Sequence, residues 1–207
     1  PAIYAIKEYA KSPKADRPLI MCEYSHAMGN SNGTLAEYWE VIESTRGLQG
    51  GFIWEMWDHG PVQTMPDGSK RNAYGGDYGE TKHDGNFCCD GMVFPDRTAK
   101  PAMHEFKAIA APIVITGVKP ASGQFKIFNK NFFKDLSEYE LQWSITCDGV
   151  IQDGGVVKLP KVAPRKSSNF KVTSKKFAKG TTRGERFITF SLVCIATTPW
   201  ALPMTEI

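Results

Sequence analysis

The sequence predicts two domains of different class: an α/β unit with parallel strands, followed by an antiparallel β-sandwich. In the first half, two continuous apolar runs are separated by a helix pattern, which is the order of a strand–helix–strand crossover. In the second half, apolar and polar residues alternate with a period of two. The change occurs close to Pro112, so we place the domains at residues 1–113 and 114–207.

The first half begins with a short helix and a buried strand. Ile3, Ile6 and Ala10 lie at helical spacing before Ser12-Pro13, which ends the pattern. The continuous apolar run Pro18–Cys22 is typical of a strand that is buried on both faces of a parallel sheet. We therefore expect this strand to lie inside the α/β unit.

A second helix and a second strand complete the predicted crossover. Thr34 and Glu37 have the spacing of a capping box, in which two side chains satisfy the first backbone amides of a helix. Apolar residues follow at helical spacing, and Gly47 is placed to end the helix. The apolar run Gly51–Trp54 predicts the next strand. The order strand, loop, helix, strand indicates a βαβ unit.

Residues 58–96 show no periodic pattern and contain turn signals such as Pro66-Asp67-Gly68. A stretch of this length without regular structure is uncommon in a compact domain unless it builds a site. The pattern then predicts a helix over Lys100–Ala110, which closes at Pro112. We therefore expect the loop to form part of a functional site.

The second half predicts several short antiparallel strands. Apolar residues alternate with polar ones over Tyr139–Cys147, and the alternation returns over Ile188–Cys194. Between them, Asp148-Gly149 is a signal for a type I′ hairpin turn. Short strands of this kind over most of the second half favour a β-sandwich.

Composition excludes several classes of protein. The chain is 42% hydrophobic and 23% charged, as folded domains are, so disorder is not expected. It contains no run of about 18 apolar residues, so we expect no membrane span. The five cysteines are an odd number without C-x-x-C spacing, which favours reduced thiols and a cytoplasmic location.

The net charge of +3 is unevenly distributed. Residues 1–113 carry 11 Lys/Arg against 15 Asp/Glu, whereas residues 114–207 carry 14 basic residues against 7 acidic ones. Ten of those 14 lie between Lys158 and Arg186. A basic stretch can bind nucleic acid, but this one lacks helical register and regular aromatic spacing. We expect a solvated edge or a surface facing an acidic partner, and no nucleic-acid partner.

Ionisable residues follow the first strand. Glu23 comes directly after the apolar run, where the carboxyl ends of parallel strands hold catalytic groups. The alternative is a structural Glu23 that forms a salt bridge with an arginine beneath the loops. His26, three residues later, either binds a ligand hydroxyl or supports the loop.

The second strand ends in two tryptophans and two carboxylates. Trp54 and Trp57 could cover the apolar face of a sugar while acidic groups bind its hydroxyls, or both could be core residues. Glu55 or Asp58 could act with Glu23, because glycoside hydrolysis uses two carboxylates. Glu55 follows Trp54 directly, so on a strand the two side chains would point to opposite faces.

These segments closely resemble the large bacterial-type β-galactosidases of glycoside hydrolase family two. The nucleophile signature lies in Arg17–Ser31, and the match continues through Tyr38-Trp39, Leu48–Trp54, Ala73–Asp77, Asn86–Cys88 and Gly91–Thr98. The second half resembles, mainly by position, the sandwich that follows the barrel in that family. The resemblance implies the last strands of a (β/α)8 TIM barrel followed by an immunoglobulin-like β-sandwich.

The resemblance also implies a role for each matching residue. Glu23 would be the nucleophile that forms a covalent galactosyl intermediate in a retaining mechanism. His26 and Trp54 would bind the sugar, through a hydroxyl and through its apolar face respectively. The main-chain carbonyl of Phe87 would ligate sodium. Asp90 would be the neighbouring sodium ligand, where the best-known members have Asn.

The resemblance further implies groups that this sequence does not contain. A complete barrel takes about 250 residues, so residues 1–113 would hold only its last two strands. The acid/base glutamate of the family lies on an earlier strand, and the ligands of the catalytic magnesium belong to absent regions. We therefore expect a segment of a larger, homo-oligomeric enzyme that acts on β-galactosides, and no useful turnover by the 207-residue chain alone.

A second hypothesis places the chain in a different class. It would be a non-catalytic binding or assembly module, whose partial barrel is a docking surface for a second chain that carries the missing half. This hypothesis predicts activity only when an N-terminal fragment is added.

Overall fold

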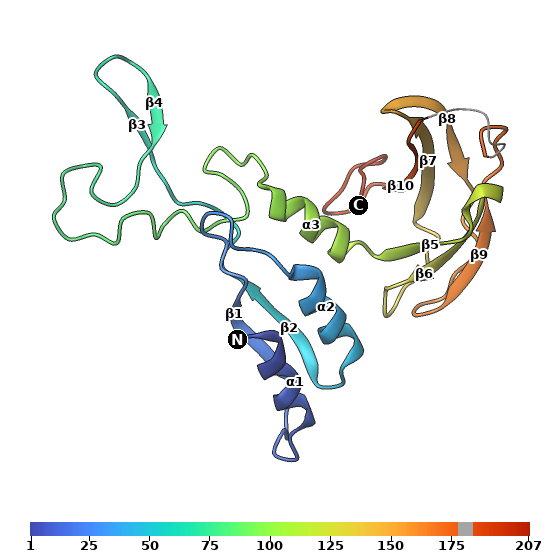
Figure 1. Ribbon diagram of the computed structural model, residues 1–207, viewed down its shortest axis with the longest axis horizontal. Coiled ribbons are helices and arrows are strands. Elements are labelled where there is room, and N and C mark those ends of the chain that lie inside the picture. The colour runs from blue at the N-terminus through green and yellow to red at the C-terminus, as the bar shows by residue number, and fades with distance from the viewer. Residues whose placement is uncertain (178–183) are drawn as a thin grey trace. The chain divides into compact units, whose positions relative to one another are not determined.

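A computed structural model describes residues 1–177 and 184–207 of the chain. It divides into two compact units, Pro1–Ala110 and Ala111–Ile207, which are coloured blue to green and green to red in Figure 1. No helix among the described residues is both long enough and apolar enough to span a bilayer.

Unit 1 is built on one parallel pair of strands. Its regular elements are α1 (Ile3–Lys11), β1 (Leu19–Tyr24), α2 (Leu35–Ser44), β2 (Leu48–Ile53), β3 (Val62–Thr64), β4 (Lys70–Asn72) and α3 (Pro101–Ala110). β1 and β2 pair in parallel, with Leu19 opposite Leu48 and Tyr24 opposite Ile53. The predicted strand–helix–strand crossover is therefore confirmed, as is the helix after Lys100. The described residues contain no closed barrel.

The core of unit 1 lies on one face of this sheet. Seven buried apolar residues from α1, β1, α2 and β2 form it, namely Ile6, Met21, Tyr24, Leu35, Val41, Ile42 and Leu48. The prediction that the first strand is buried on both faces is wrong for this structure. Ile20 is 55% exposed and Phe52 on β2 is 67% exposed, because the helices cover only the face that carries Met21 and Tyr24.

Gly51 allows the two strands to approach closely. A Cβ at this position would lie 2.7 Å from Met21 Cβ and 2.9 Å from the Met21 carbonyl oxygen. Both distances are shorter than non-bonded contacts allow, so β2 requires glycine here.

The predicted capping box at Thr34 is also wrong. Thr34 has φ 67°, in the left-handed region, and its side chain makes no capping hydrogen bond. A capping residue normally has extended backbone, which aims its hydroxyl at the first amides of the helix. The turn that leads into α2 rotates the Thr34 side chain away from those amides.

The long loop after β2 is irregular as predicted, apart from a small hairpin. β3 and β4 are antiparallel, with Gln63 opposite Arg71, and the predicted turn Pro66-Asp67-Gly68 lies between them. An ion pair of 2.9 Å between Arg71 Nη2 and Asp77 Oδ1 ties the hairpin to the following loop. The loop is therefore ordered by polar contacts more than by a hydrophobic core.

Unit 2 consists of two three-stranded antiparallel sheets. Its elements are β5 (Ile113–Lys119), the 3-10 helix η1 (Pro120–Ser122), β6 (Gln124–Asn129), β7 (Tyr139–Cys147), β8 (Val150–Val157), β9 (Ser167–Lys171) and β10 (Arg186–Cys194). The strand orders are β5-β6-β9 and β10-β7-β8. Cys147 lies opposite Val150, so the hairpin predicted at Asp148-Gly149 is confirmed.

The core of unit 2 draws on both sheets. Phe125 and Ile127 of β6 and Leu141 of β7 belong to one buried cluster, together with Phe170 of β9 and Leu192 of β10. Two sheets that share one core are the basis of a sandwich. The immunoglobulin-like connectivity implied by the resemblance stays a prediction.

Candidate active site

Glu23 lies near the carboxyl end of β1 and is exposed. The next residue, Tyr24, is only 4% exposed, and its hydroxyl accepts a hydrogen bond of 2.9 Å from Trp39 Nε1. Tyr24 thus fixes the strand end to α2 while Glu23 stays at the surface. No ion pair or hydrogen bond to the Glu23 carboxylate occurs among the described residues, so the structural alternative, a salt bridge with an arginine, is not observed.

Asp90 is the centre of a cluster that contains the other predicted site residues. It is 2% exposed, and its Oδ2 accepts a hydrogen bond of 3.2 Å from Trp54 Nε1. The same oxygen lies 3.6 Å from His26 Nε2. The His26 ring meets the Phe87 ring edge-on, with centroids 6.3 Å apart. The structure therefore brings His26, Trp54, Phe87 and Asp90 together. Glu23 lies three residues before His26 in the sequence, and within the described ranges no hydrogen bond or ion pair joins it to them.

Backbone pairing holds Asp90 in this position. The Glu55 amide donates to the Asp90 carbonyl at 2.6 Å, and the Met92 amide donates to the Glu55 carbonyl at 2.8 Å. Further along, the Asp58 amide donates to the Val93 carbonyl at 3.0 Å. Residues 90–93 therefore run alongside residues 55–58, and this ladder fixes the loop that supplies Asp90 to the end of β2.

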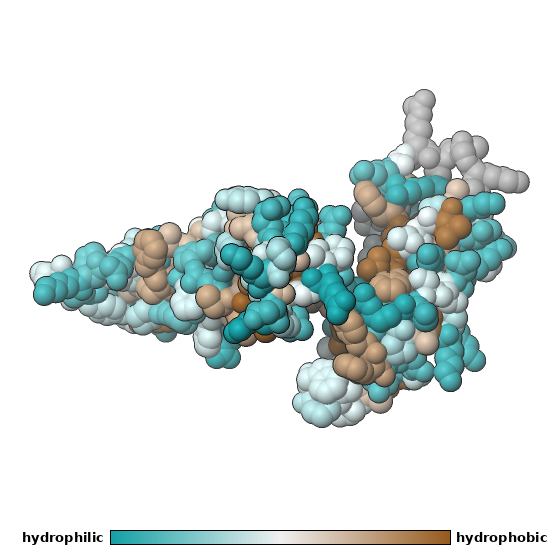
Figure 2. All heavy atoms as spheres, turned by 90° about the horizontal axis from the view of Figure 1, so that it is seen from below, coloured by the Kyte–Doolittle hydropathy of each residue, from teal (hydrophilic) through white to brown (hydrophobic). Residues whose placement is uncertain are grey.

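Two tryptophans reach the surface after β2. Trp54 is 43% exposed and Trp57 is 38% exposed, so the alternative that both are core residues is wrong. Trp57 donates from Nε1 to the Pro95 carbonyl at 3.2 Å, and the Arg97 guanidinium lies 4.5 Å from its ring centre. Figure 2, coloured by hydropathy, shows strongly hydrophobic residues (brown) at the surface as well; tryptophan is near neutral on this scale and is drawn pale. The Trp54 ring is thus anchored through its nitrogen and open on part of its surface.

Glu55 also contacts Asp90, contrary to the expected opposite orientation of Trp54 and Glu55. β2 ends at Ile53, so the alternation of a strand no longer applies to these two residues. Burial, and then the neighbouring Asp90 carboxyl, raise the pKa of Glu55 above its ordinary value. His59 Nδ1, 3.4 Å from Glu55 Oε1, acts in the opposite direction.

One oxygen of Asp90 has no protein partner. Asp90 Oδ1 is buried and accepts no hydrogen bond in the described part of the chain. A buried carboxylate oxygen is costly unless it is paired or coordinates a cation. Carboxylate oxygens are ligands that hard cations prefer, so the unpaired Asp90 Oδ1 fits part of such a site. No group of three or more His, Cys, Asp or Glu within residues 1–177 and 184–207 could hold a metal by itself.

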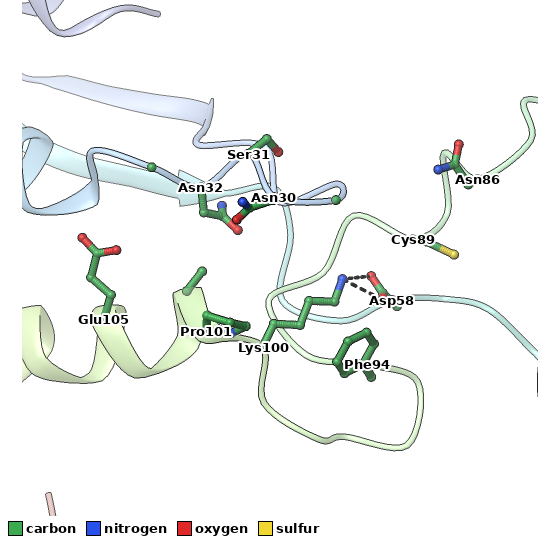
Figure 3. Close-up of a pocket in the computed structure, with 13 residues that line it drawn as sticks. Asn30, Ser31, Asn32, Asp58, Asn86, Cys89, Phe94, Lys100, Pro101 and Glu105 are labelled. Atoms are coloured by element: carbon green, nitrogen blue, oxygen red, sulfur yellow. Dashed lines mark hydrogen bonds and ion pairs between the residues drawn. The ribbon is translucent and has the colours of Figure 1, made fainter.

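A pocket of about 710 Å³ lies beside this cluster, between the loop after β1 and the start of α3. Figure 3 shows Asn30, Ser31 and Asn32 on one side and Lys100 with Asp58 on the other. None of the five predicted site residues lines it. Asp58 is buried against Lys100 and is therefore no free second carboxylate for catalysis. Lys100 was not predicted as a site residue, although a lysine directly before a helix is unfavourable next to the positive end of the helix dipole.

Comparison with known proteins confirms the resemblance to family two. The TIM-barrel domain of the glycosyl hydrolases family 2 matches residues 1–115, and domain 4 of beta-galactosidase matches residues 125–207. The chain is 39% identical over 197 residues to a beta-galactosidase of Priestia megaterium. It is 37% identical over 200 residues to one of Aeromonas hydrophila, and 42% identical over 163 residues to one of Vibrio cholerae.

These matches cover most of this chain but little of the relatives. The aligned regions cover 95%, 96% and 78% of the chain, and 19%, 19% and 15% of the three relatives in the same order. The chain thus spans about one fifth of the length of the curated relatives it matches.

Proposed function

The chain belongs to glycosyl hydrolase family 2, and we propose that it supplies the nucleophile side of the active site of a retaining β-galactosidase. Two observations carry this proposal: the cluster of His26, Trp54 and Asp90, and the exposed, unpaired Glu23 carboxylate near the end of a parallel strand, three residues before His26. The remainder of the barrel, with the acid/base glutamate, completes the site.

In this proposal Glu23 forms the bond to the sugar. A Glu23 oxygen attacks the anomeric carbon while the bond from that carbon to the leaving oxygen breaks, and the acid/base group protonates the leaving oxygen. Water then attacks the anomeric carbon, gives its proton to the same group and releases Glu23. An exposed carboxylate without a protein partner suits this role, because no ion pair has to break before attack.

Trp54 and His26 would hold the galactose. The open face of the Trp54 indole suits the apolar C–H face of a pyranose, and its hydrogen bond to Asp90 fixes the plane of the ring. His26 keeps a partly exposed side chain beside Asp90 and can reach a sugar hydroxyl. Both contacts would position the anomeric carbon for Glu23.

The buried Asp90 Oδ1 supports a cation beside the sugar, and the resemblance identifies that cation as sodium. A bound sodium ion would supply a fixed positive charge that can bind a sugar hydroxyl. Asp90 in place of the family's asparagine adds a negative charge, so we expect tighter cation binding than an amide would give. The described residues offer no set of ligands for magnesium, so we derive no step through that ion.

The exposed face of the β1–β2 sheet is the one feature among the described residues that favours the second hypothesis, an assembly module. Ile20 and Phe52 are exposed there, at 55% and 67%, and would be covered by a complementary chain. Under both hypotheses the 207-residue chain alone has no useful turnover. Activity that appears when an N-terminal fragment is mixed with this chain supports the assembly role, whereas the enzyme hypothesis requires Glu23 to be essential.

The test of the proposed function is hydrolysis of a nitrophenyl β-galactoside by the complete enzyme that contains this segment. Glu23→Gln should lower kcat by several orders of magnitude, because the amide cannot form the covalent intermediate. Glu37→Gln, on the exposed side of α2, is the matched control and should leave kcat nearly unchanged. A loss of less than about tenfold for Glu23→Gln contradicts the assignment.

A further inference from the structure

A buried ion pair joins Asp58, in the segment that follows β2, to Lys100, the residue directly before α3. Lys100 Nζ lies 2.9 Å from Asp58 Oδ1 and 2.8 Å from Asp58 Oδ2, and the dashed lines in Figure 3 mark both contacts. The Lys100 side chain is 11% exposed and the Asp58 side chain is 5% exposed. Desolvation makes such a pair expensive, and apolar side chains of similar volume often stabilise a fold as well. The pair therefore calls for an explanation other than the stability of the fold.

The position of Lys100 strengthens this argument. Lys100 directly precedes Pro101, the first residue of α3. The amino end of a helix carries a partial positive charge, so a buried lysine is unfavourable there unless a carboxylate compensates it. Asp58 supplies that carboxylate from a segment 42 residues away in the sequence. The sequence thus places a costly cation where the long-range contact with Asp58 compensates its charge.

The pair also holds residues 90–94 from two sides. Asp58 Oδ1 accepts a hydrogen bond of 2.7 Å from the amide of Gly91, the residue next to Asp90. The Lys100 amide donates to the Met92 carbonyl at 3.0 Å, and Lys100 Nζ lies 5.0 Å from the centre of the Phe94 ring. Two side-chain contacts of the pair and one main-chain contact of Lys100 thus end on the segment that follows Asp90.

We propose that Asp58 and Lys100 are positioning residues, which set the affinity of the site for the sugar and its cation by fixing Asp90. This inference rests on the proposed function, in which Asp90 orients Trp54 and His26 and holds the cation. Asp58 and Lys100 touch none of the reacting groups. Without Lys100, the Asp58 carboxylate loses the partner that holds it against the Gly91 amide, so the segment that carries Asp90 loosens while Glu23 on β1 keeps its place.

The kinetic test uses the complete enzyme with the variant Lys100→Met, which keeps an unbranched side chain of similar size and removes its charge. We expect the KM for the galactoside and the half-saturating sodium concentration to rise about 10- to 100-fold, with a much smaller change in kcat. Lys100→Arg, which keeps the charge, should recover most of the affinity. Lys134→Met breaks an exposed ion pair in unit 2, with Glu138, and should change neither quantity. An unchanged KM and sodium dependence in Lys100→Met overturn the proposal.

Hydrogen exchange provides a readout that does not depend on activity. In the same variant, amides in residues 90–93 should exchange about tenfold faster or more than in the wild type, whereas the amides of α2 should not change. If the wild type does not hydrolyse galactosides, the proposed function fails, but this measurement still decides whether the pair fixes the segment. Asp58→Asn/Lys100→Met leaves no unpaired charge, so it keeps both tests usable if the single variant does not fold. Unchanged exchange in either variant contradicts the positioning role.

Discussion

Replacement of Gly91 by alanine tests whether the ladder beside Asp90 is as tightly packed as the structure indicates. A Cβ at Gly91 would lie 2.2 Å from the Asp58 amide nitrogen and 2.3 Å from the Trp57 carbonyl carbon. Optimal non-bonded separations are about 3.5 Å or more, so the two backbone segments have to separate by about 1 Å. Both obstructing atoms belong to the backbone, and no side-chain rotation can relieve the overlap.

We expect Gly91→Ala to lower the free energy of unfolding of unit 1 by about 3 kcal/mol, the upper end of the usual cost of overpacking. For a unit of this size, that loss lowers the transition temperature by about 10 °C or more. Calorimetry of the purified chain measures this change, with Gly33→Ala as the control. Gly33 has no neighbouring heavy atom within 4 Å of an added Cβ and needs no positive φ. Unfolding of Gly91→Ala within about 2 °C of the control would refute the described packing of residues 55–58 against 90–93.

Two further predictions follow from titratable groups in unit 1. The folded-state pKa of Glu55 is raised, so the protonated form favours folding and stability is lost as the pH rises through that pKa. The free energy of unfolding, measured by chemical denaturation between pH 4 and 8, should therefore fall as the pH rises, and it should fall less in Glu55→Gln. Equal pH dependence of the two proteins would contradict the burial of Glu55 beside Asp90. Burial raises the pKa of Cys89 to about 11, whereas Cys22 is exposed. Iodoacetamide at pH 7.5 should therefore label Cys22 well before Cys89, as detected by mass spectrometry. The reverse order would contradict the burial of the Cys89 thiol.

The parts of the fold that follow local patterns could be predicted from the sequence. Apolar runs predicted β1 and β2, the spacing after Lys100 predicted α3, and Asp148-Gly149 predicted the β7–β8 hairpin. Each of these depends on residues that are neighbours in the chain. The capping box predicted at Thr34 was wrong although its spacing was correct. A two-residue motif does not specify the left-handed backbone that Thr34 adopts.

The candidate site was harder to predict because its contacts are not local. Their positions after the two apolar runs made His26 and Trp54 candidates, the resemblance added Phe87 and Asp90, and the structure places the four together. No periodic pattern marks the pairing of residues 55–58 with 90–93, because it consists of backbone hydrogen bonds between two irregular segments. For the same reason the Asp58–Lys100 pair and the contact of Glu55 with Asp90 could not be derived from spacing.

Covalent trapping tests most directly whether Glu23 forms a covalent bond to galactose, as we propose. A 2-deoxy-2-fluoro-β-galactoside with a good leaving group should react with the nucleophile of the complete enzyme and release the glycosyl-enzyme only slowly, because fluorine destabilises the oxocarbenium-like transition states of both steps. Peptide mapping by mass spectrometry then locates the fluorogalactosyl group. We predict that it is attached to Glu23 and is absent from Glu23→Gln. A label on another carboxylate, or an active enzyme that acquires no label, would contradict the account.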